Sequence, residues 1–210
     1  MGYLFKGLYV ITDRKLIPRD RFINTVEKAL IGGAKIVQLR EKDTPEREIV
    51  RLGKELLKVT KKYRVPLIIN DYPELSKEIG ADGVHLGEYD PSVSEARQLL
   101  GDTAIIGVSC YGKIERGIQA EEEGASYAAF GTPFFTPTKP DRKITPFEVL
   151  REAREKIRKI PIFAIGGIHK ENAPSVLETG VDGVAVITSV FGSPDPEMAA
   201  RDLANLFVNI

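Results

Sequence analysis

GADGVHLG, at residues 80–87, follows a pattern that the chain uses three more times. The other copies are GGAKIVQLR (32–40), GASYAAFG (124–131) and GVDGVAVIT (180–188). In each copy a glycine follows a polar segment, and a short apolar run comes after it. Glycine is favoured just past the end of a helix, because it adopts a left-handed backbone without strain. Each copy therefore predicts the end of a helix followed by a buried strand.

Four further apolar runs alternate with these copies along the chain. They are LYVIT (8–12), PLIIND (66–71), AIIGVS (104–109) and PIFAIGG (161–167). Pro66 and Pro161 stand at the first residue of their runs, where a strand tolerates a missing amide. The runs are rich in valine and isoleucine, which is typical of parallel strands covered by helices. The sequence thus predicts eight parallel strands.

The segments between the runs have the apolar spacing of amphipathic helices. The predicted helices cover residues 19–31, 46–63, 73–79, 92–100, 113–123, 146–158, 170–178 and 196–207. Eight strand–helix units in 210 residues predict an α/β fold, a single-domain (β/α)8 TIM barrel over residues 1–210. The alternative is a doubly wound open sheet, which would leave two of the strands unused.

Composition narrows the classes of partner. The chain has 30 Lys and Arg against 30 Asp and Glu, so bulk charge favours neither nucleic acid nor an acidic membrane surface. No apolar run approaches the roughly 20 residues of a membrane-spanning helix. Cys110 is the single cysteine, and residues 1–15 lack a long apolar signal core. We therefore expect a cytoplasmic protein.

Polar residues follow almost every predicted strand, at the end where TIM barrels bind their ligands. The strongest cluster is Gln38-Leu39-Arg40-Glu41-Lys42. With a period of two, Gln38, Arg40 and Lys42 share one face of the strand. If that face points to the barrel axis, two cations and an amide indicate an anionic ligand. The alternative is that the strand has ended and these residues lie in a solvated loop.

Two aspartates follow consecutive strands. Asp71 comes after the third predicted strand and Asp90 after the fourth, and neighbouring strands are about 5 Å apart. The two carboxylates can then share a magnesium ion with water and ligand phosphate. Alternatively, either aspartate caps the helix that follows it. Asn70 either orients a polar heterocycle or has a structural role.

Residues 132–146 have neither helical nor strand periodicity and include four prolines. Loops of this length in compact domains are usually functional or disordered, so we interpret this one as a gating loop or as a stiff surface excursion. Gly166-Gly167 and Thr188-Ser189 follow the last two strands, where barrels commonly bind phosphate.

The remaining reactive side chains do not predict nucleophilic chemistry. His85 alternates with Leu86 and is expected to be an inward-facing, hydrogen-bonded core histidine. Cys110 has no nearby histidine in the sequence to activate it.

Together these motifs resemble the thiamine-phosphate synthase (thiamine phosphate pyrophosphorylase) family over essentially the whole chain. The matching pieces, in family order, are LYVITD, VQLREK, LIIND, DGVHLGEYD, IIGVS, FGTPFFTPTKP, AIGGI and GVAVIT. The resemblance implies a transferase of thiamine biosynthesis. It would join hydroxymethylpyrimidine diphosphate to hydroxyethylthiazole phosphate, giving thiamine phosphate and diphosphate, with Mg²⁺ as cofactor.

The resemblance also implies roles for individual residues. Pyrimidine and diphosphate binding falls on Gln38, Arg40, Glu41, Lys42, Asn70, Ser109 and Lys139, of which Arg40, Lys42, Ser109 and Lys139 would be catalytic. The magnesium ligands fall on Asp71 and Asp90. The thiazole-phosphate contacts fall on Thr136, Thr138, Gly167, Ile187 and Thr188.

Two other functions remain open from the sequence. A thiazole tautomerase of the same superfamily would share the fold and the thiazole-phosphate pocket, but it has no diphosphate to handle. A non-catalytic barrel could bind a phosphorylated heterocycle without any departing group. In every case we expect small-molecule ligands, no nucleic acid and no membrane, and a homo-oligomer is compatible with the sequence.

Overall fold

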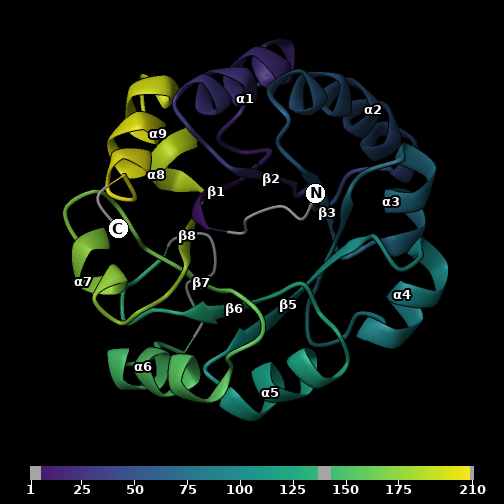
Figure 1. The fold of residues 1–210 in the computed structure, drawn as a ribbon. Helices are drawn as coiled ribbons and strands as arrows, with labels where there is room; N and C mark the ends of the chain where they lie inside the picture. Colours follow the sequence, from purple (N-terminus) through teal and green to yellow (C-terminus); the bar gives the residue numbers. More distant parts are fainter. Residues whose placement is uncertain (1–5, 137–142, 209–210) are drawn as a thin grey trace.

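Parallel strands form a closed barrel at the centre of the molecule. We describe the fold from a computed structural model, which covers residues 6–136 and 143–208. The strands in this part of the chain are β1 (Gly7–Ile11), β2 (Ile36–Leu39), β3 (Leu67–Asn70), β4 (Gly83–Leu86), β5 (Ile105–Tyr111), β6 (Tyr127–Gly131), β7 (Ile162–Ile165) and β8 (Gly183–Val186). They pair in sequence order, and β8 closes on β1 (Figure 1). The predicted barrel is confirmed, and the open-sheet alternative is wrong.

Helices surround the strands as an outer ring. They are α1 (Phe22–Ile31), α2 (Glu46–Tyr63), α3 (Pro73–Ile79), α4 (Val93–Leu100), α5 (Ile114–Glu122), α6 (Phe147–Lys156), α7 (Ala173–Leu177), α8 (Thr188–Phe191) and α9 (Pro196–Asn205). A 3-10 turn, η1 (Arg19–Arg21), precedes α1, within the range predicted as one helix. The short α8 was not predicted as an element, because four residues are too few for a periodic pattern. That all of residues 1–210 form one domain stays a prediction.

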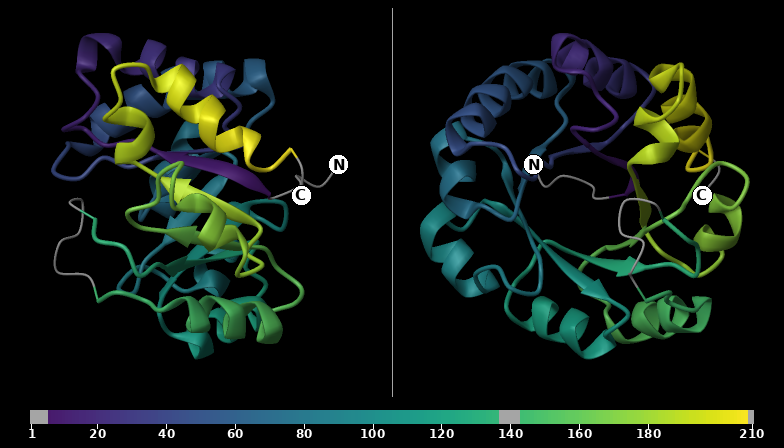
Figure 2. Two further views of the ribbon diagram at one scale, coloured as in Figure 1. Left: turned by 90° about the vertical axis from the view of Figure 1, so that its left-hand side faces the viewer. Right: turned by 180° about the vertical axis from the view of Figure 1, so that it is seen from behind.

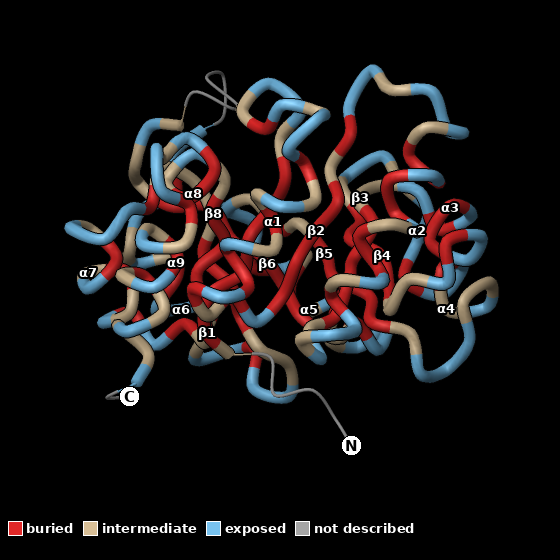
Figure 3. Tube along the Cα trace, turned by 90° about the horizontal axis from the view of Figure 1, so that it is seen from above, coloured by how far each residue is buried: buried red, intermediate tan, exposed pale blue. Residues whose placement is uncertain are grey.

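Side chains along each strand point alternately into the barrel and out toward the helices, which produces two apolar layers. Figure 3 shows that the strands at the centre of the molecule are buried. Inward-facing side chains fill the barrel: Tyr9, Ile11, Ile36, Ile68, Ile105, Tyr127, Phe163 and Ala185. Outward-facing side chains such as Leu8, Val37 and Leu39 pack with the helices in the larger core. The inside of the barrel is therefore a packed core.

The last helix completes the ring beside the first. Figure 2 shows α9, in yellow, next to α1, in purple, and the packing of these two helices is extensive. At Gly32, just past α1, a Cβ would lie 2.4 Å from the carbonyl oxygen of Glu197 and 2.7 Å from the Cβ of Ala200. Glycine is thus required at position 32, because α9 lies too close to leave room for a side chain there. In the described part of the chain, every helix is too short or too polar to span a bilayer.

Strand β5 is longer than predicted. The apolar run ends at Ser109, but pairing with β6 continues to Tyr111 across a register shift between Ser109 and Tyr111. Tyr111 has a φ of 58°, which is unusual for a residue with a side chain. The irregularity leaves Cys110 buried in the outer core, while Ser109 and Tyr111 face the barrel mouth.

Candidate active site

A cavity of about 910 Å³, counted with its open mouth, lies at the carboxyl ends of the strands. Every strand contributes to its wall, from Ile11 on β1 to Val186 on β8. Parallel strands in a closed ring place all their carboxyl ends at one rim, which is why residues so far apart in sequence meet here. Gln38, Arg40, Asn70, Ser109, Thr136, Gly167, Ile187 and Thr188 all line this cavity, as the sequence predicted.

The motif after β2 supplies the cationic side of the mouth. Gln38 is buried and donates a hydrogen bond from Nε2 to the Tyr9 hydroxyl at 2.6 Å, inside the barrel. The Arg40 guanidinium lies 3.5 Å from the Asp13 carboxylate. The Lys42 ammonium contacts the Asp71 carboxylate. Gln38 and Arg40 therefore face the cavity as predicted, whereas Lys42 is exposed. Strand β2 ends at Leu39, so residues 40–42 lie in the loop after it, which was the alternative interpretation.

Asp71 and Asp90 form the acidic side. Asp90 accepts a hydrogen bond from the Gly87 amide at 2.6 Å. Burial raises the pKa of Asp90, and the negative charge of Asp71 adds to the rise, whereas the Gly87 amide and Lys42 oppose it. The Lys42 ammonium, which contacts Asp71, thus acts on both carboxylates.

The donor set suits magnesium. In the described residues, no group of three or more histidine, cysteine, aspartate or glutamate side chains could hold a metal ion. Two carboxylates can nevertheless hold Mg²⁺, which keeps water ligands and is commonly bound together with substrate phosphates. Asp71 and Asp90 offer oxygen atoms only, which favours Mg²⁺ over a softer metal.

A chain of hydrogen bonds crosses the floor of the cavity. The hydroxyl of Tyr9, which holds Gln38, also shares a hydrogen bond of 2.8 Å with the hydroxyl of Tyr127. His85 links Tyr127 to Ser109, with Nδ1 3.0 Å from the tyrosine hydroxyl and Nε2 2.9 Å from the Ser109 hydroxyl. The expectation of an inward, hydrogen-bonded His85 is confirmed.

The two tyrosines in this hydrogen-bond network, Tyr9 and Tyr127, stay protonated. Burial raises the pKa of Tyr9 and of Tyr127 well above the ordinary value of 10.0. The floor therefore connects Gln38 to Ser109 through two protonated tyrosines and His85, and it orients both of these side chains.

Backbone atoms form much of the cavity wall that lies across from Gln38 and Arg40. Gly166 and Gly167 follow β7 with φ values of 117° and 64°, a conformation that side chains rarely adopt. A Cβ on Gly167 would come within 2.2 Å of the Phe135 carbonyl oxygen, so only glycine lets the 132–136 segment approach this closely. Thr136, Ile187 and Thr188 stand on the same wall. The arrangement suits a phosphate group approaching glycine backbone and hydroxyls.

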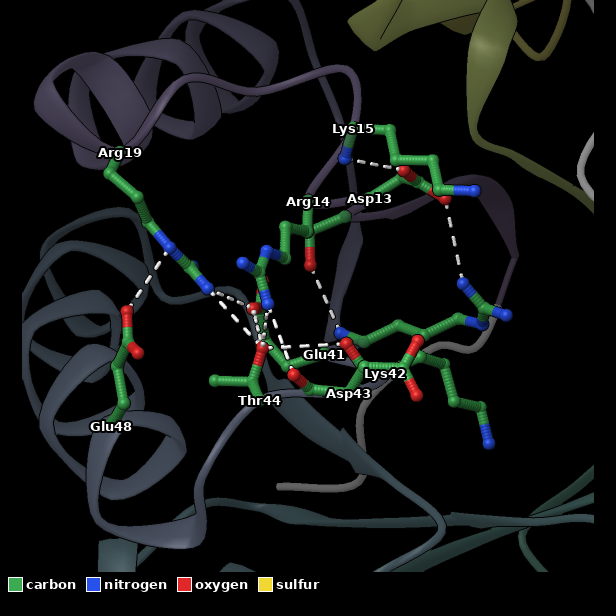
Figure 4. Close-up of polar contacts among 11 residues, drawn as sticks. Asp13, Arg14, Lys15, Arg19, Glu41, Lys42, Asp43, Thr44 and Glu48 are labelled. Atoms are coloured by element: carbon green, nitrogen blue, oxygen red, sulfur yellow. Dashed lines mark hydrogen bonds and ion pairs between the residues drawn. The ribbon is translucent and has the colours of Figure 1, made fainter.

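Several predicted residues do not line the cavity. Lys42 and Asp71 contact each other outside its lining, and Asp90 lines a neighbouring hollow between α4 and α5. Thr138 and Lys139 lie outside the described residues. The Glu41 side chain is fully buried and pairs with Arg19 and Thr44, behind the loop (Figure 4). Its expected place among the substrate-binding residues is therefore corrected. The side chain of Glu41 points toward the helices and away from the mouth of the cavity, although Arg40 next to it lines the cavity.

Sequence reasoning missed several residues that shape the site. Tyr9 and Tyr127 lie within apolar runs, so the sequence indicates only that they are buried. The period of two in LYVIT does predict that Tyr9 faces the other side of the strand from Leu8 and Val10, as observed. Arg116 of α5 donates to the carbonyl oxygens of Ser109 and Gly87 at 2.7 and 2.6 Å. No signal in the sequence predicts these bonds, because they join elements far apart in the chain.

Known proteins resemble the chain over almost its full length. Residues 8–190 match the family model described as Thiamine monophosphate synthase. A thiamine-phosphate synthase of Methylococcus capsulatus is 48% identical over 202 residues, covering 96% of this chain and 89% of the relative. One of Clostridium novyi is 46% identical, covering 95% of this chain and 97% of the relative.

Solved structures agree with these sequence matches. A thiamine phosphate pyrophosphorylase from Pyrococcus furiosus superposes with a TM-score of 0.87 at 40% identity, covering 95% of this chain and 94% of that one. A 3-hexulose-6-phosphate synthase reaches a TM-score of 0.68 at only 16% identity, which shows a shared fold and nothing more.

Proposed function

The chain belongs to the thiamine monophosphate synthase family, and from this membership we propose the reaction and the role of each side chain. The enzyme joins the methylene carbon of hydroxymethylpyrimidine diphosphate to the ring nitrogen of hydroxyethylthiazole phosphate. The bond from the methylene carbon to the diphosphate oxygen breaks, and the products are thiamine phosphate and diphosphate. One observation carries the proposal: Gln38, Arg40, Asn70 and Ser109 line one cavity. Lys42 and Asp71, which are in contact, follow the strands that contain Gln38 and Asn70, and their charges act on Asp90.

The departing diphosphate sets the main chemical demand. The aminopyrimidine ring stabilises the positive charge that develops on its methylene carbon, and the thiazole nitrogen then captures it. Such a reaction needs neutralisation of the leaving group and alignment of the two rings more than it needs a strong base. The hydrogen-bonded pair of Tyr9 and Tyr127 is consistent with this, since neither tyrosine is ionised.

Each wall of the cavity has a role in the proposal. Arg40 and Lys42 bind the diphosphate, with Gln38, Asn70 and Ser109 orienting the pyrimidine beside it. Gly167, Thr136 and Thr188 receive the thiazole phosphate on the other side. Asp71 and Asp90 would hold Mg²⁺, which when bound offsets the negative charge of the diphosphate.

The two alternative functions fit the residues less well. A thiazole tautomerase has no diphosphate and no use for two cations facing two carboxylates. A binding barrel needs affinity without departure chemistry. The single buried cysteine supports a reducing compartment, and we place the enzyme in the cytoplasm.

The deciding experiment incubates the purified protein with both substrates and Mg²⁺, and measures thiamine phosphate and diphosphate. We expect both products in equal amounts, and no product when EDTA removes the metal. Release of neither product would contradict the proposal and favour a binding barrel. Conversion of the thiazole alone, unaffected by EDTA, would favour the tautomerase.

A variant ties the metal requirement to the acidic pair. In Asp90→Asn we expect kcat/KM to fall by at least about tenfold. Changing a group that only supports a metal ligand already lowers metal affinity or activity on this scale, and Asp90 is proposed to be a ligand itself. The matched control is Asp102→Asn, which alters an exposed aspartate beyond α4. If Asp90→Asn keeps wild-type activity and the same Mg²⁺ requirement, the assignment of Asp90 is wrong.

A further inference from the structure

Glu41 stands between the two cations of the mouth, yet its side chain points the other way. Its exposed fraction is 0%, whereas the neighbouring Lys42 is exposed and Arg40 lines the cavity. A carboxylate taken fully out of water is costly unless a cation and hydrogen bonds compensate it. Its partners should therefore account for its position.

Those partners come from the segment that follows β1 and from the loop itself. Arg19, in η1, places Nη2 2.5 Å from Glu41 Oε2. The Thr44 hydroxyl donates to the same oxygen at 3.0 Å. Arg19 also lies 3.2 Å from Glu48 in the first turn of α2. Figure 4 shows Arg19 between Glu48 on one side and the Glu41–Thr44 pair on the other. Glu41 is thus bound directly to η1 and is linked to α2 through Arg19.

Compensation of the buried pair is incomplete. Among the described residues, Glu41 Oε1 and Arg19 Nη1 are buried without a hydrogen-bond partner. An ion pair with unsatisfied atoms contributes little net stability, because the lost hydration offsets most of the attraction. The pair is therefore better explained by the geometry it imposes than by the stability it adds.

The rest of the loop is tied as closely as Glu41. Arg40 donates its backbone amide to the Thr12 hydroxyl at 3.0 Å. Arg14 donates to the carbonyl oxygen of Asp43 at 3.1 Å, and Asp43 has a φ of 58°. The loop is thus held at Arg40 and at Asp43. The direction in which Glu41 is anchored therefore limits the directions in which Arg40 and Lys42 can point.

We propose that Glu41, held by Arg19 and Thr44, is a positioning residue that directs Arg40 and Lys42 toward the diphosphate. Arg40 lines the cavity and Lys42 contacts Asp71, while Glu41 between them is held by Arg19. Because residue 41 is fixed on that side, the backbone on either side of it keeps Arg40 and Lys42 in these directions. Glu41 acts through the two cations and does not touch substrate. The inference rests on the proposed diphosphate site.

The test separates positioning from general stability by comparing the two substrates. In Glu41→Gln we expect KM for the pyrimidine diphosphate to rise about tenfold, the scale seen when supporting groups of a site change. KM for the thiazole phosphate should change less than about twofold, since its wall lies across the cavity. Glu55→Gln on α2 is the matched control, because it removes an exposed carboxylate whose partner, Arg51, is 2.9 Å away. It should leave both constants unchanged.

Thr44→Val keeps the proposal testable if Glu41→Gln does not fold. It removes one hydrogen bond to Glu41 and keeps both charges, so we expect a smaller rise that is again confined to the diphosphate substrate. Unchanged constants in a folded Glu41→Gln, or equal rises for both substrates, would overturn the proposal. If Glu41→Gln does not fold, unchanged constants in Thr44→Val overturn it. Failure of the wild-type protein to use the diphosphate substrate would instead contradict the proposed function.

Discussion

At the scale of single residues, Ser109 and Cys110 show how one position along a strand separates two environments. Ser109 lines the cavity and meets His85, while Cys110 packs among the outer core side chains at 0% exposure. Burial raises the pKa of the Cys110 thiol to about 12, and the nearby Arg116 opposes the rise only in part. The residue beside a catalytic candidate is therefore an inert thiol.

We expect Cys110 to resist alkylation in the folded protein. Its folded pKa lies above the ordinary value of 9.0, so the thiol's contribution to stability is complete below about 9 and is lost as the pH rises toward 12. Mass spectrometry after iodoacetamide treatment at about pH 8 should find the native protein unmodified and the unfolded protein labelled. Rapid labelling of folded protein would show that the thiol is accessible.

At the scale of elements, the repeated sequence pattern is explained by hydrogen bonds at the beginnings of strands. The Asp82 carboxylate accepts from the amide of Leu67, and the Asp182 carboxylate accepts from the amide of Ile162, both at 2.8 Å. Ser126, at the matching position of another copy, accepts from the amide of Ile106 at 3.0 Å. In these three copies the residue just before the strand thus holds the beginning of a neighbouring strand, at the end opposite the cavity.

Arg116 joins neighbouring strands at the cavity end. Its guanidinium binds the carbonyl oxygens of Ser109 and Gly87, and the Gly87 amide in turn binds Asp90. We expect Arg116→Met to lower kcat/KM about tenfold by loosening Ser109 and Asp90 together. Loss of its charged hydrogen bonds should also lower the free energy of unfolding by about 1–3 kcal/mol.

Arg97 provides the control for this prediction. It donates to the carbonyl oxygen of Ala104 at 2.6 Å and to that of Gly101 at 3.1 Å, at the opposite end of β5. Arg97→Met should lose similar stability in urea unfolding and keep its kinetic constants. Equal losses of activity in both variants would mean that Arg116 acts only through stability.

At the scale of the whole molecule, the barrel depends on closure between its first and last units. β1 pairs with β8, and α9 packs on α1 with Gly32 at the contact. Gly32 has a φ of −69°, which any residue can adopt, so a larger side chain there meets only a steric barrier.

We expect Gly32→Ala to lower the free energy of unfolding by about 1–3 kcal/mol, because it forces α1 and α9 apart in a packed interface. The contact is remote from the cavity, so the folded variant should keep wild-type KM values. Asn24→Ala, an exposed change on α1, is the control. Urea unfolding followed by circular dichroism measures both, and equal stability of the two variants would contradict the steric argument.

The sequence determined the barrel and the rim of its site, since both follow from local rules. Glycines that end helices, strands with a period of two and polar residues after each strand are readable one segment at a time. That is why Gln38, Arg40 and Asn70 could be placed at the mouth before any coordinates were known. Several predicted strands begin or end one or two residues away from the observed ones, and at β5 a register shift extends the pairing beyond the apolar run.

Only the tertiary structure decided which side chains meet. Glu41 differs from Arg40 by one position, yet its partner Arg19 belongs to a different unit of the barrel. The link from Tyr9 to Tyr127 spans 118 residues. Such contacts depend on how strands align around the ring and on how closely the helices pack on them. Those distances are set by the folded molecule as a whole, and no pattern within a single segment encodes them.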